Sequence, residues 1–337
     1  MKARYRLVSA GLGSCLLSLA AMVAFTEKTP AETQPPPVAA PLPPPHPRAW
    51  APPTWFPESR RDALWVLDDL DGEPTHSWGP KVNAYAGILA DLDRSEILWA
   101  RDPDAPRSIA SVTKLVSSLT LMSDPDVDLD KTVCVSLEQW PSRPGARSKF
   151  ETGDCQPGWA LVGAALIASD NRGAFSMPAI ADEDYYRFVD RMGDTAADLH
   201  MEMASFTDPA GIEDENMASA RDVLKAVTAV SLHPRLSMIA SAPQWWLQTP
   251  RGPRLLGTTN RLLRMSLEPA SRRFTPPPYE TLAAKTGYTD TAHYCFATVV
   301  RSLETGRRYG AVVLAAPNSR SRFEDVLSML RWADKQD

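Results

Sequence analysis

The pair Ser111 and Lys114 is the first feature of the sequence that could do chemistry. Residues 111–122 contain neither Gly nor Pro and carry apolar residues at helical spacing, which predicts a helix with both side chains on one face. A serine hydroxyl needs a neighbouring base to act as a nucleophile, and a lysine supplies one where burial or positive charge lowers its pKa. Many solvated helices contain S-x-x-K by chance, so the pair alone is weak evidence for a serine acyl-enzyme.

Two further motifs give this pair its weight. Ser169-Asp170-Asn171 follows an Ala/Leu-rich predicted helix at 159–168, and Lys285-Thr286-Gly287 ends a predicted strand at 281–285. S-x-x-K, S-D-N and K-T-G in this order are the signature of class A β-lactamases and penicillin-binding proteins. Each motif is common alone, but the three together favour a serine acyl-enzyme hydrolase.

The chain resembles the penicillin-binding D-alanyl-D-alanine carboxypeptidase/endopeptidase family, the low-molecular-mass type within the serine β-lactamase-like superfamily. The resemblance covers residues 80–320, approximately. Besides the three motifs it rests on four local features: Ile109–Leu115, Ala168–Arg172, Ser205–Ile212 with Asn216 and Ser219–Asp222, and Thr259–Leu263 upstream of Lys285–Thr289.

The order of the predicted elements indicates an α+β fold. Strands are predicted at both ends of the domain with helices between them, which gives one mostly antiparallel sheet and an inserted helical lobe. The resemblance implies the β-lactamase/transpeptidase-like fold, a five-stranded antiparallel sheet flanked by helices. Strands are expected at 85–91, 96–100, 281–285, 294–300 and 309–315, and helices at 111–122, 159–168, 185–192, 221–231 and 323–332. A cleft between sheet and lobe is the expected place for the site.

The resemblance also implies roles in the hydrolysis of a D-Ala-D-Ala or related bond. Ser111 is expected to form the acyl-enzyme after Lys114 takes its proton, and Ser169 to relay a proton to the leaving amine. The groups expected to bind substrate are Asn171 for an amide, Lys285 and Thr286 for the carboxylate, Gly287 for close approach of the strand, and the backbone N–H groups of Ser111 and Tyr288 as an oxyanion hole. No cofactor or metal is implied, and the five histidines show no metal-ligand spacing.

Two features near these motifs have open interpretations. His293 follows Ala292 where the family often has Gly, and we expect a turn residue, with an effect on substrate preference at the cleft rim as the alternative. Trp245 and Trp246 could form a platform for glycan or peptide, although a core position is the simpler expectation. The acidic stretch at 181–184 is expected to be a solvated loop or a helix start.

The cysteines fit a chain that is exported from the cytoplasm. Cys134 and Cys155 flank a Pro/Gly-containing excursion and could close it as a disulfide, with two unpaired thiols as the alternative. Cys295 lies in an apolar predicted strand and is expected to be a small buried residue.

The N-terminus predicts export as well. Lys2, Arg4 and Arg6 precede an uncharged apolar run at 7–25, so residues 1–28 are interpreted as a signal peptide or membrane anchor. The Pro-rich residues 29–58 predict an extended linker, followed by a catalytic domain at 59–337. We therefore expect the domain on the periplasmic side of the inner membrane, anchored there or released after signal cleavage, with lipidation at Cys15 as a weaker option.

The net charge and the residues around the motifs limit the possible binding partners and the competing functions. The net charge of −5 without a basic block argues against a nucleic-acid partner, and the expected partners are peptidoglycan stem peptides as substrate and β-lactam antibiotics as inhibitors. A class A-like β-lactamase would need an E-x-x-L-N glutamate, whereas Glu202 is followed by Met-Ala-Ser-Phe. The second alternative is a non-catalytic, membrane-tethered sensor. The motifs do not separate carboxypeptidase from endopeptidase, but the N-terminal anchor and the lack of an obvious C-terminal β-domain favour the endopeptidase.

Overall fold

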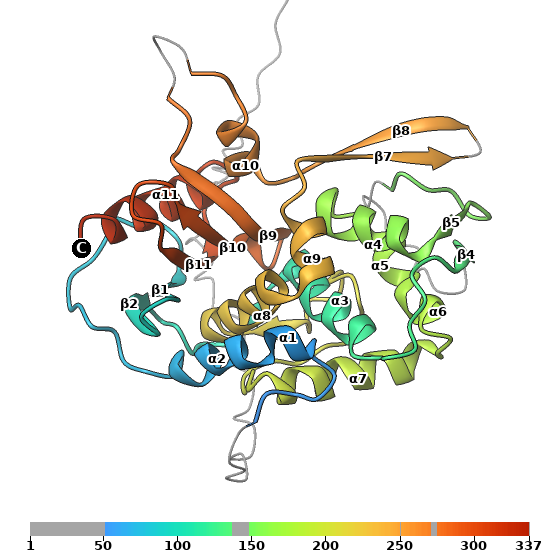
Figure 1. Cartoon of the computed structure of the whole chain (residues 1–337), viewed down its shortest axis with the longest axis horizontal. Coiled ribbons are helices and arrows are strands. Elements are labelled where there is room, and N and C mark those ends of the chain that lie inside the picture. The colour runs from blue at the N-terminus through green and yellow to red at the C-terminus, as the bar shows by residue number, and fades with distance from the viewer. Residues whose placement is uncertain (1–50, 137–147, 250, 271–274, 337) are drawn as a thin grey trace, which may run out of the picture. The chain divides into compact units, whose positions relative to one another are not determined.

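The computed structural model describes residues 51–136, 148–249, 251–270 and 275–336. They contain a five-stranded antiparallel sheet in the order β2-β1-β11-β10-β9, which confirms the predicted fold class (Figure 1). The last strand of the chain lies between strands from both ends of the domain, because β11 pairs with β1 and with β10. The strands are β1 Ala86–Asp91, β2 Glu96–Arg101, β9 Tyr279–Thr289, β10 His293–Ser302 and β11 Arg308–Ala316.

The helical lobe is inserted between β2 and β9 (Figure 1). The predicted helix at 111–122 is in two parts, a 3₁₀ turn η2 (Ala110–Thr113) and α3 (Lys114–Met122). The predicted helix at 185–192 is longer than expected and ends at Asp198. The other helices between β2 and β9 are α4 Gly158–Ile167, α5 Asn171–Phe175, α6 Met177–Ile180, α7 Tyr185–Asp198, α8 Ala220–Leu232, α9 Pro234–Ala240 and α10 Arg261–Ser266. Before β1 come α1 Glu58–Arg61, η1 Asp62–Trp65 and α2 Val66–Asp69, and after β11 comes α11 Ser321–Ala333.

Helices cover both faces of the sheet. Along β11, Val312 and Leu314 belong to the hydrophobic cluster that includes α8, whereas Ala311 and Val313 belong to the cluster that includes α11. Because successive residues of a strand point to opposite faces, β11 is buried on both sides. This explains why its sequence is a continuous apolar run without polar alternation.

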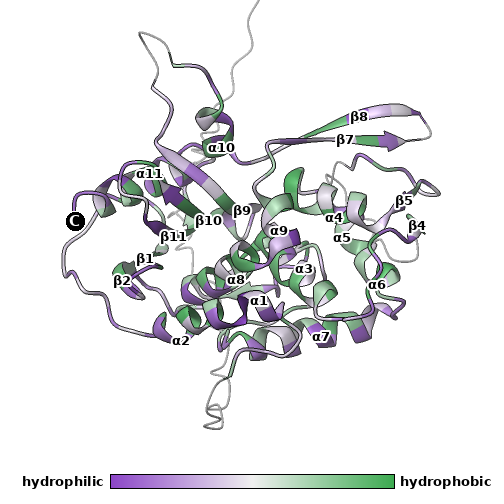
Figure 2. Ribbon diagram, in the orientation of Figure 1, coloured by the Kyte–Doolittle hydropathy of each residue, from purple (hydrophilic) through white to green (hydrophobic). Residues whose placement is uncertain are grey.

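The sequence also sets where the lobe helices begin. Asp184 accepts a hydrogen bond from the backbone N–H of Arg187 and caps α7, so the acidic stretch at 181–184 is a helix start. Ser219 and Asp222 form a reciprocal capping box at the start of α8. Figure 2 shows hydrophobic residues along α3, α4 and α8 and hydrophilic residues on α1. The helices that carry the motifs are therefore anchored in the core.

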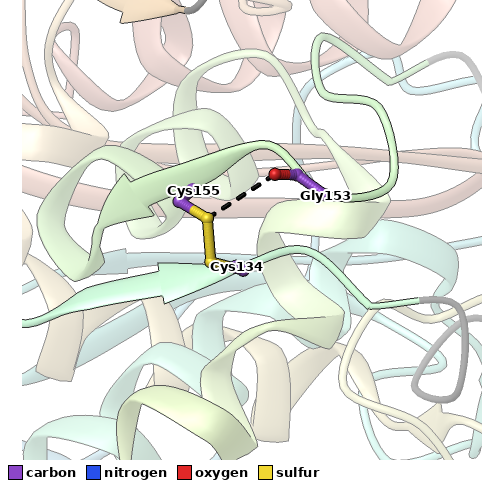
Figure 3. The surroundings of a disulfide bond; sticks show 3 residues. All are labelled: Cys134, Gly153 and Cys155. Atoms are coloured by element: carbon purple, nitrogen blue, oxygen red, sulfur yellow. Dashed lines mark hydrogen bonds between the residues drawn. A yellow bond between two sulfur atoms is a disulfide. The ribbon is translucent and has the colours of Figure 1, made fainter.

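Three small sheets complete the fold. β3 (Arg107–Ser108) pairs with β6 (Met217–Ala218), β4 (Thr132–Cys134) with β5 (Cys155–Pro157), and β7 (Gln244–Thr249) with β8 (Gly252–Gly257). Cys134 and Cys155 face each other across the β4–β5 pair and form a disulfide, so they are not the two unpaired thiols of the alternative (Figure 3).

The folded domain begins earlier than residue 59. Phe56, inside the stretch interpreted as linker, is 1% exposed and belongs to the main hydrophobic cluster, and Trp55 packs against that cluster. The last residues of the expected linker therefore contribute to the core. The predicted export segment at 1–28 and linker residues 29–50 lie outside the residues described. Within residues 51–336, the described helices are all too short or too polar to cross a bilayer.

Candidate active site

The amine of Lys114 meets the hydroxyl of Ser111, as the sequence predicts. Lys114 Nζ lies 2.8 Å from Ser111 Oγ, 2.8 Å from Asn171 Oδ1 and 2.6 Å from the carbonyl oxygen of Ala210. Its side chain is fully buried at the start of α3. The fold thus brings the first and second motifs to one amine, although they lie on different helices.

Burial makes this amine a base at neutral pH. Desolvation lowers the pKa of Lys114 from 10.5 to about 7, and the charges of Asp208 and Asp170 act in the opposite direction. The desolvation effect is larger, so a substantial share of the amine is neutral at pH 7. A neutral amine in hydrogen-bonding distance of Ser111 Oγ can accept the hydroxyl proton.

A second lysine network connects the second and third motifs. Lys285 Nζ donates to Ser169 Oγ and to the carbonyl oxygen of Thr286, each at 2.8 Å. The pKa of Lys285 is lowered well below its ordinary value, first by burial and then by the positive charges of Lys114 and Arg322. Ser169 therefore has a proton donor at its oxygen, which is the arrangement a proton relay needs.

The S-D-N motif contacts both lysines: Ser169 accepts a hydrogen bond from Lys285, and Asn171 accepts one from Lys114. Asp170, between them, holds the turn. Ser169 has a left-handed backbone (φ +58°) at the end of α4, and Asn171 is the first residue of α5. Between them, buried Asp170 caps α5 by accepting from Gly173 N, and it also accepts from Ser148 Oγ at 2.8 Å. The capping carboxylate fixes the turn and therefore the directions of the side chains on either side.

Two glycines enclose the turn that carries the nucleophile. Ala110, just before Ser111, has φ +49°, a left-handed conformation that costs energy in a residue with a Cβ. A Cβ on Gly287 would lie 2.6 Å from the carbonyl oxygen of Ile109, and one on Gly211 would lie 1.9 Å from that of Ala110. Gly287 thus lets β9 approach the nucleophile's own turn. The expected approach of substrate to the strand at Gly287 stays a prediction.

Asp208 holds the loop that positions Lys114, and sequence reasoning gave it no role. Its carboxylate accepts from the backbone N–H groups of Ala210 and Gly211 at 2.6 and 2.7 Å, and from the Nδ2 of Asn216 at 2.7 Å. These bonds fix the Ala210 carbonyl that accepts from Lys114. An Asp directly before Pro-Ala-Gly is typical of a side-chain-stabilised turn, so the signal was present in the sequence.

Two further residues reach the K-T-G motif from distant segments. The hydroxyl of Thr286 lies 2.7 Å from that of Thr259. Arg322, from α11, donates from Nη1 to the carbonyl oxygens of Gly287 at 3.0 Å and Cys295 at 3.3 Å. No local pattern marks Arg322, because its contact with β9 exists only once α11 packs on the sheet.

The end of β9 forms a polar rim. Tyr288 is half exposed; its hydroxyl donates to Asp290, and its ring centroid lies 4.4 Å from that of Tyr294. His293 is exposed, has φ +53° and is the first residue of β10, where it pairs with Thr289 directly after the turn at 290–292, so the expectation of a turn residue is wrong by one position. Cys295 is buried, and burial raises the pKa of its thiol to about 11, which leaves it protonated and unreactive.

The glutamate considered for a β-lactamase lies elsewhere. Glu202 borders a separate cavity of about 360 Å³ together with His200, Arg221 and Lys225. It therefore does not join the network around Lys114. The part of the chain that the structure describes contains no group of three His, Cys, Asp or Glu side chains placed to bind a metal ion.

A sheet whose edge strand carries K-T-G, set against a lobe that carries S-x-x-K and S-D-N, defines a serine acyl-enzyme hydrolase of the penicillin-recognising class. Within that class, residues 73–318 match the model of the D-alanyl-D-alanine carboxypeptidase family. The chain belongs to this family of peptidases.

Individual relatives and solved structures are similar to this chain over most of its length. A D-alanyl-D-alanine endopeptidase of Escherichia coli is 22% identical over 76% of this chain and 78% of its own, and one of Pseudomonas aeruginosa is 25% identical over 74% and 76%. The solved D-alanyl-D-alanine carboxypeptidase of Mycobacterium tuberculosis superposes with a TM-score of 0.67 at 20% identity, over 79% of this chain and 97% of that one. The Streptomyces K15 DD-transpeptidase gives 0.65 at 17% identity, over 77% and 99%. At these identities the solved structures establish the shared fold.

Proposed function

We propose that this protein is a serine DD-peptidase that hydrolyses D-alanyl bonds in peptidoglycan stem peptides. One observation carries the proposal: a buried lysine with a pKa of about 7 contacts the hydroxyl of Ser111. The names of the curated relatives support the choice of bond, since they include D-alanyl-D-alanine endopeptidases and carboxypeptidases.

In the proposed acylation step, neutral Lys114 takes the proton of Ser111 as its Oγ attacks the carbonyl carbon of the D-alanine. The backbone N–H groups of Ser111 and Tyr288 are proposed to bind the resulting oxyanion, an arrangement favoured by β9 being an edge strand. The C–N bond then breaks, and Ser169 passes a proton to the leaving amine. Its hydrogen bond to Lys285 supports this relay.

The substrate carboxylate is proposed to bind beside Lys285 and Thr286. An anion placed next to the buried amine of Lys285 would raise its pKa again, so binding and protonation of this lysine favour each other. Asn171 is proposed to bind a substrate amide while its Oδ1 holds Lys114. The proton that Lys114 took from Ser111 replaces the one that Ser169 gave to the leaving amine, so Lys114 is neutral again before deacylation. Water then attacks the ester carbonyl, Lys114 takes the water's proton, and it passes that proton to Ser111 Oγ as the ester bond breaks.

We place the catalytic domain on the periplasmic side of the inner membrane, where peptidoglycan is found. The support is the sequence of the N-terminus, in which basic residues precede the apolar run at 7–25. The Pro-rich segment that follows would hold the domain away from the bilayer. Fractionation of cells into soluble periplasm and inner membrane would test the anchor, which would be refuted by recovery of the full-length chain in the cytoplasm.

The decisive test uses the full-length protein and its Ser111→Ala variant. We expect penicillin to form a covalent adduct on Ser111 that mass spectrometry locates, and we expect purified muropeptides to lose terminal D-Ala or to be cut from cross-linked dimers to monomers. Ser111→Ala should abolish both reactions and keep the thermal melting temperature. An adduct on another residue, or no cleavage of any muropeptide, would contradict the proposal.

The two alternatives give different results in the same samples. A β-lactamase would turn over nitrocefin rapidly, whereas a DD-peptidase would retain a long-lived acyl adduct. A non-catalytic sensor would bind muropeptides without cleaving them.

A further inference from the structure

The hairpin of β7 and β8 begins and ends beside the proposed carboxylate-binding group. We call residues 244–257 the β7–β8 ribbon. Thr258 N donates to the carbonyl oxygen of Pro243 at 2.9 Å and closes the base of the ribbon. The next residue, Thr259, has its hydroxyl 2.7 Å from that of Thr286 and donates from N to Ile167 O at 3.0 Å. The ribbon therefore starts directly at the end of the site where the leaving group would lie.

One face of the ribbon is fixed to the lobe. The ring of Trp245 lies 5.6 Å from that of Trp159 in α4, and Leu256, opposite Trp245, is buried. Near the turn, Arg251 forms ion pairs with Asp154 at 2.7 Å and with Glu151, both in the segment that the disulfide closes. Figure 1 shows the ribbon extending over α4. It is thus held at both its base and its tip, which keeps its other face in a defined position.

The opposite face is uncovered and has the chemistry to bind a peptide. Trp246 and Leu255 pair directly across the two strands and are 59% and 42% exposed, so the expectation of a core position is wrong for Trp246. Trp245 is partly buried against the main hydrophobic cluster. Exposed Gln244 and Gln248 flank Trp246 on the same face and offer amide hydrogen bonds. Residues 244–257 include no Asp or Glu, and neither of their two arginines is on this face, because Arg251 is ion-paired to the lobe and Arg254 lies opposite Leu247 on the Trp245 face. The uncovered face is thus uncharged, and its apolar and amide groups suit the aliphatic and amide parts of a peptide.

Chain length decides which leaving group can reach this face. Thr259 lies four positions after Leu255, a path of at most about 14 Å in extended chain. Within β8, the two strand steps from Leu255 to Gly257 alone span about 7 Å, so a single D-alanine from a monomeric stem peptide, about one such step long, does not reach from the base of the ribbon to Leu255. In a cross-linked dimer, the leaving amine carries a complete second stem peptide of about the length of the path from Leu255 to Thr259.

We propose that the exposed face of the β7–β8 ribbon binds the second stem peptide of a cross-linked dimer, so that cross-links are the preferred substrate. The inference rests on the proposed DD-peptidase function and on Thr286 binding the substrate carboxylate. Trp246 and Leu255 would pack on the aliphatic parts of the departing peptide, while Gln244 and Gln248 would bond to its amides.

The experiment compares kcat/KM of the full-length protein for a cross-linked muropeptide dimer and for a monomeric pentapeptide. We expect Trp246→Ala, and separately Leu255→Ser, to lower the ratio of dimer to pentapeptide by about tenfold, as loss of a large contact at a binding surface does. Trp78→Ala is the matched control, because Trp78 is 60% exposed and packs with Trp332 at the far end of α11. It should leave the ratio unchanged.

The outcomes separate this proposal from the one before it. If the wild-type protein cleaves neither substrate, the DD-peptidase function itself is wrong. If it cleaves both and Trp246→Ala keeps the wild-type ratio, the ribbon does not bind the second peptide. The same conclusion follows if Trp246→Ala only changes the sedimentation of the protein, because the exposed face would then be a contact between copies of the chain.

Discussion

The reactivity of Ser111 should rise with pH through the titration of Lys114. Burial lowers the pKa of this lysine from 10.5 to about 7. At about 1.4 kcal/mol per pKa unit, the shift corresponds to about 5 kcal/mol of destabilisation of the charged amine. At pH 7 about half of the amine is then neutral, compared with roughly one part in 3,000 for a lysine with an ordinary pKa.

The direction follows from the mechanism, because only the neutral amine can take the serine proton. The second-order rate constant for acylation by a fluorescent penicillin should therefore be low at acid pH, reach half its maximum near pH 7 and level off above about pH 8. Stopped-flow measurements from about pH 5.5 to about pH 9.5 cover the transition. A flat profile, or a midpoint near the ordinary lysine value of 10.5, would refute the assignment of Lys114 as the base.

A charge-preserving variant isolates the role of the titration. Lys114→Arg keeps a positive group that does not lose its proton in this range, so acylation should fall by about 10³-fold and lose its midpoint near pH 7. Lys81→Arg is the control, because Lys81 is exposed and borders α11 near Trp332. It should keep the wild-type profile. A Lys114→Arg variant that retained wild-type acylation at pH 7 would show that another group is the base.

Two further substitutions test the packing around the site. Gly287→Ala would place a methyl group 2.6 Å from the carbonyl oxygen of Ile109, so β9 must shift; we expect about 1–3 kcal/mol of lost stability and about 10²-fold slower acylation, and unchanged melting and acylation would contradict the close approach. Replacing both Cys134 and Cys155 by Ser opens a loop with a sequence separation of 21 and should lower the free energy of unfolding by about 3 kcal/mol in denaturant titrations. A double variant as stable as the wild-type protein would show that the disulfide contributes little.

Much of the fold was readable in the sequence because local patterns agreed with the global arrangement. The apolar runs that became β1, β10 and β11 are long enough to identify as strands, since helices bury both of their faces. The boundaries of α8 were close for the same reason: Ser219 and Asp222 form a capping box that stands in the sequence itself. The break between η2 and α3 was not predictable, because it depends on Gly211 and Gly287 packing against the turn.

Residue roles that depend on long-range contacts were the least predictable. Asp208 was visible as a turn residue, but its hold on the Ala210 carbonyl matters only because Lys114 lies against that carbonyl. Arg322 reaches Gly287 from a helix that packs on the sheet after the chain has folded back. The two tryptophans at 245 and 246 differ for an equally nonlocal reason, since only one face of the ribbon packs on α4.

The sequence by itself determined the reactive groups and their order: a serine and a lysine three residues apart, then S-D-N, then K-T-G. Spacing within a motif is local, so it fixes which side chains can share a helix face or a turn. Only the tertiary structure decided that Lys114 contacts Asn171 while Lys285 contacts Ser169, and that Lys114 loses enough solvent to have a pKa of about 7. The desolvation of a side chain depends on all the residues that pack around it, and these come from many segments of the chain. It therefore cannot be deduced from any one segment of the sequence.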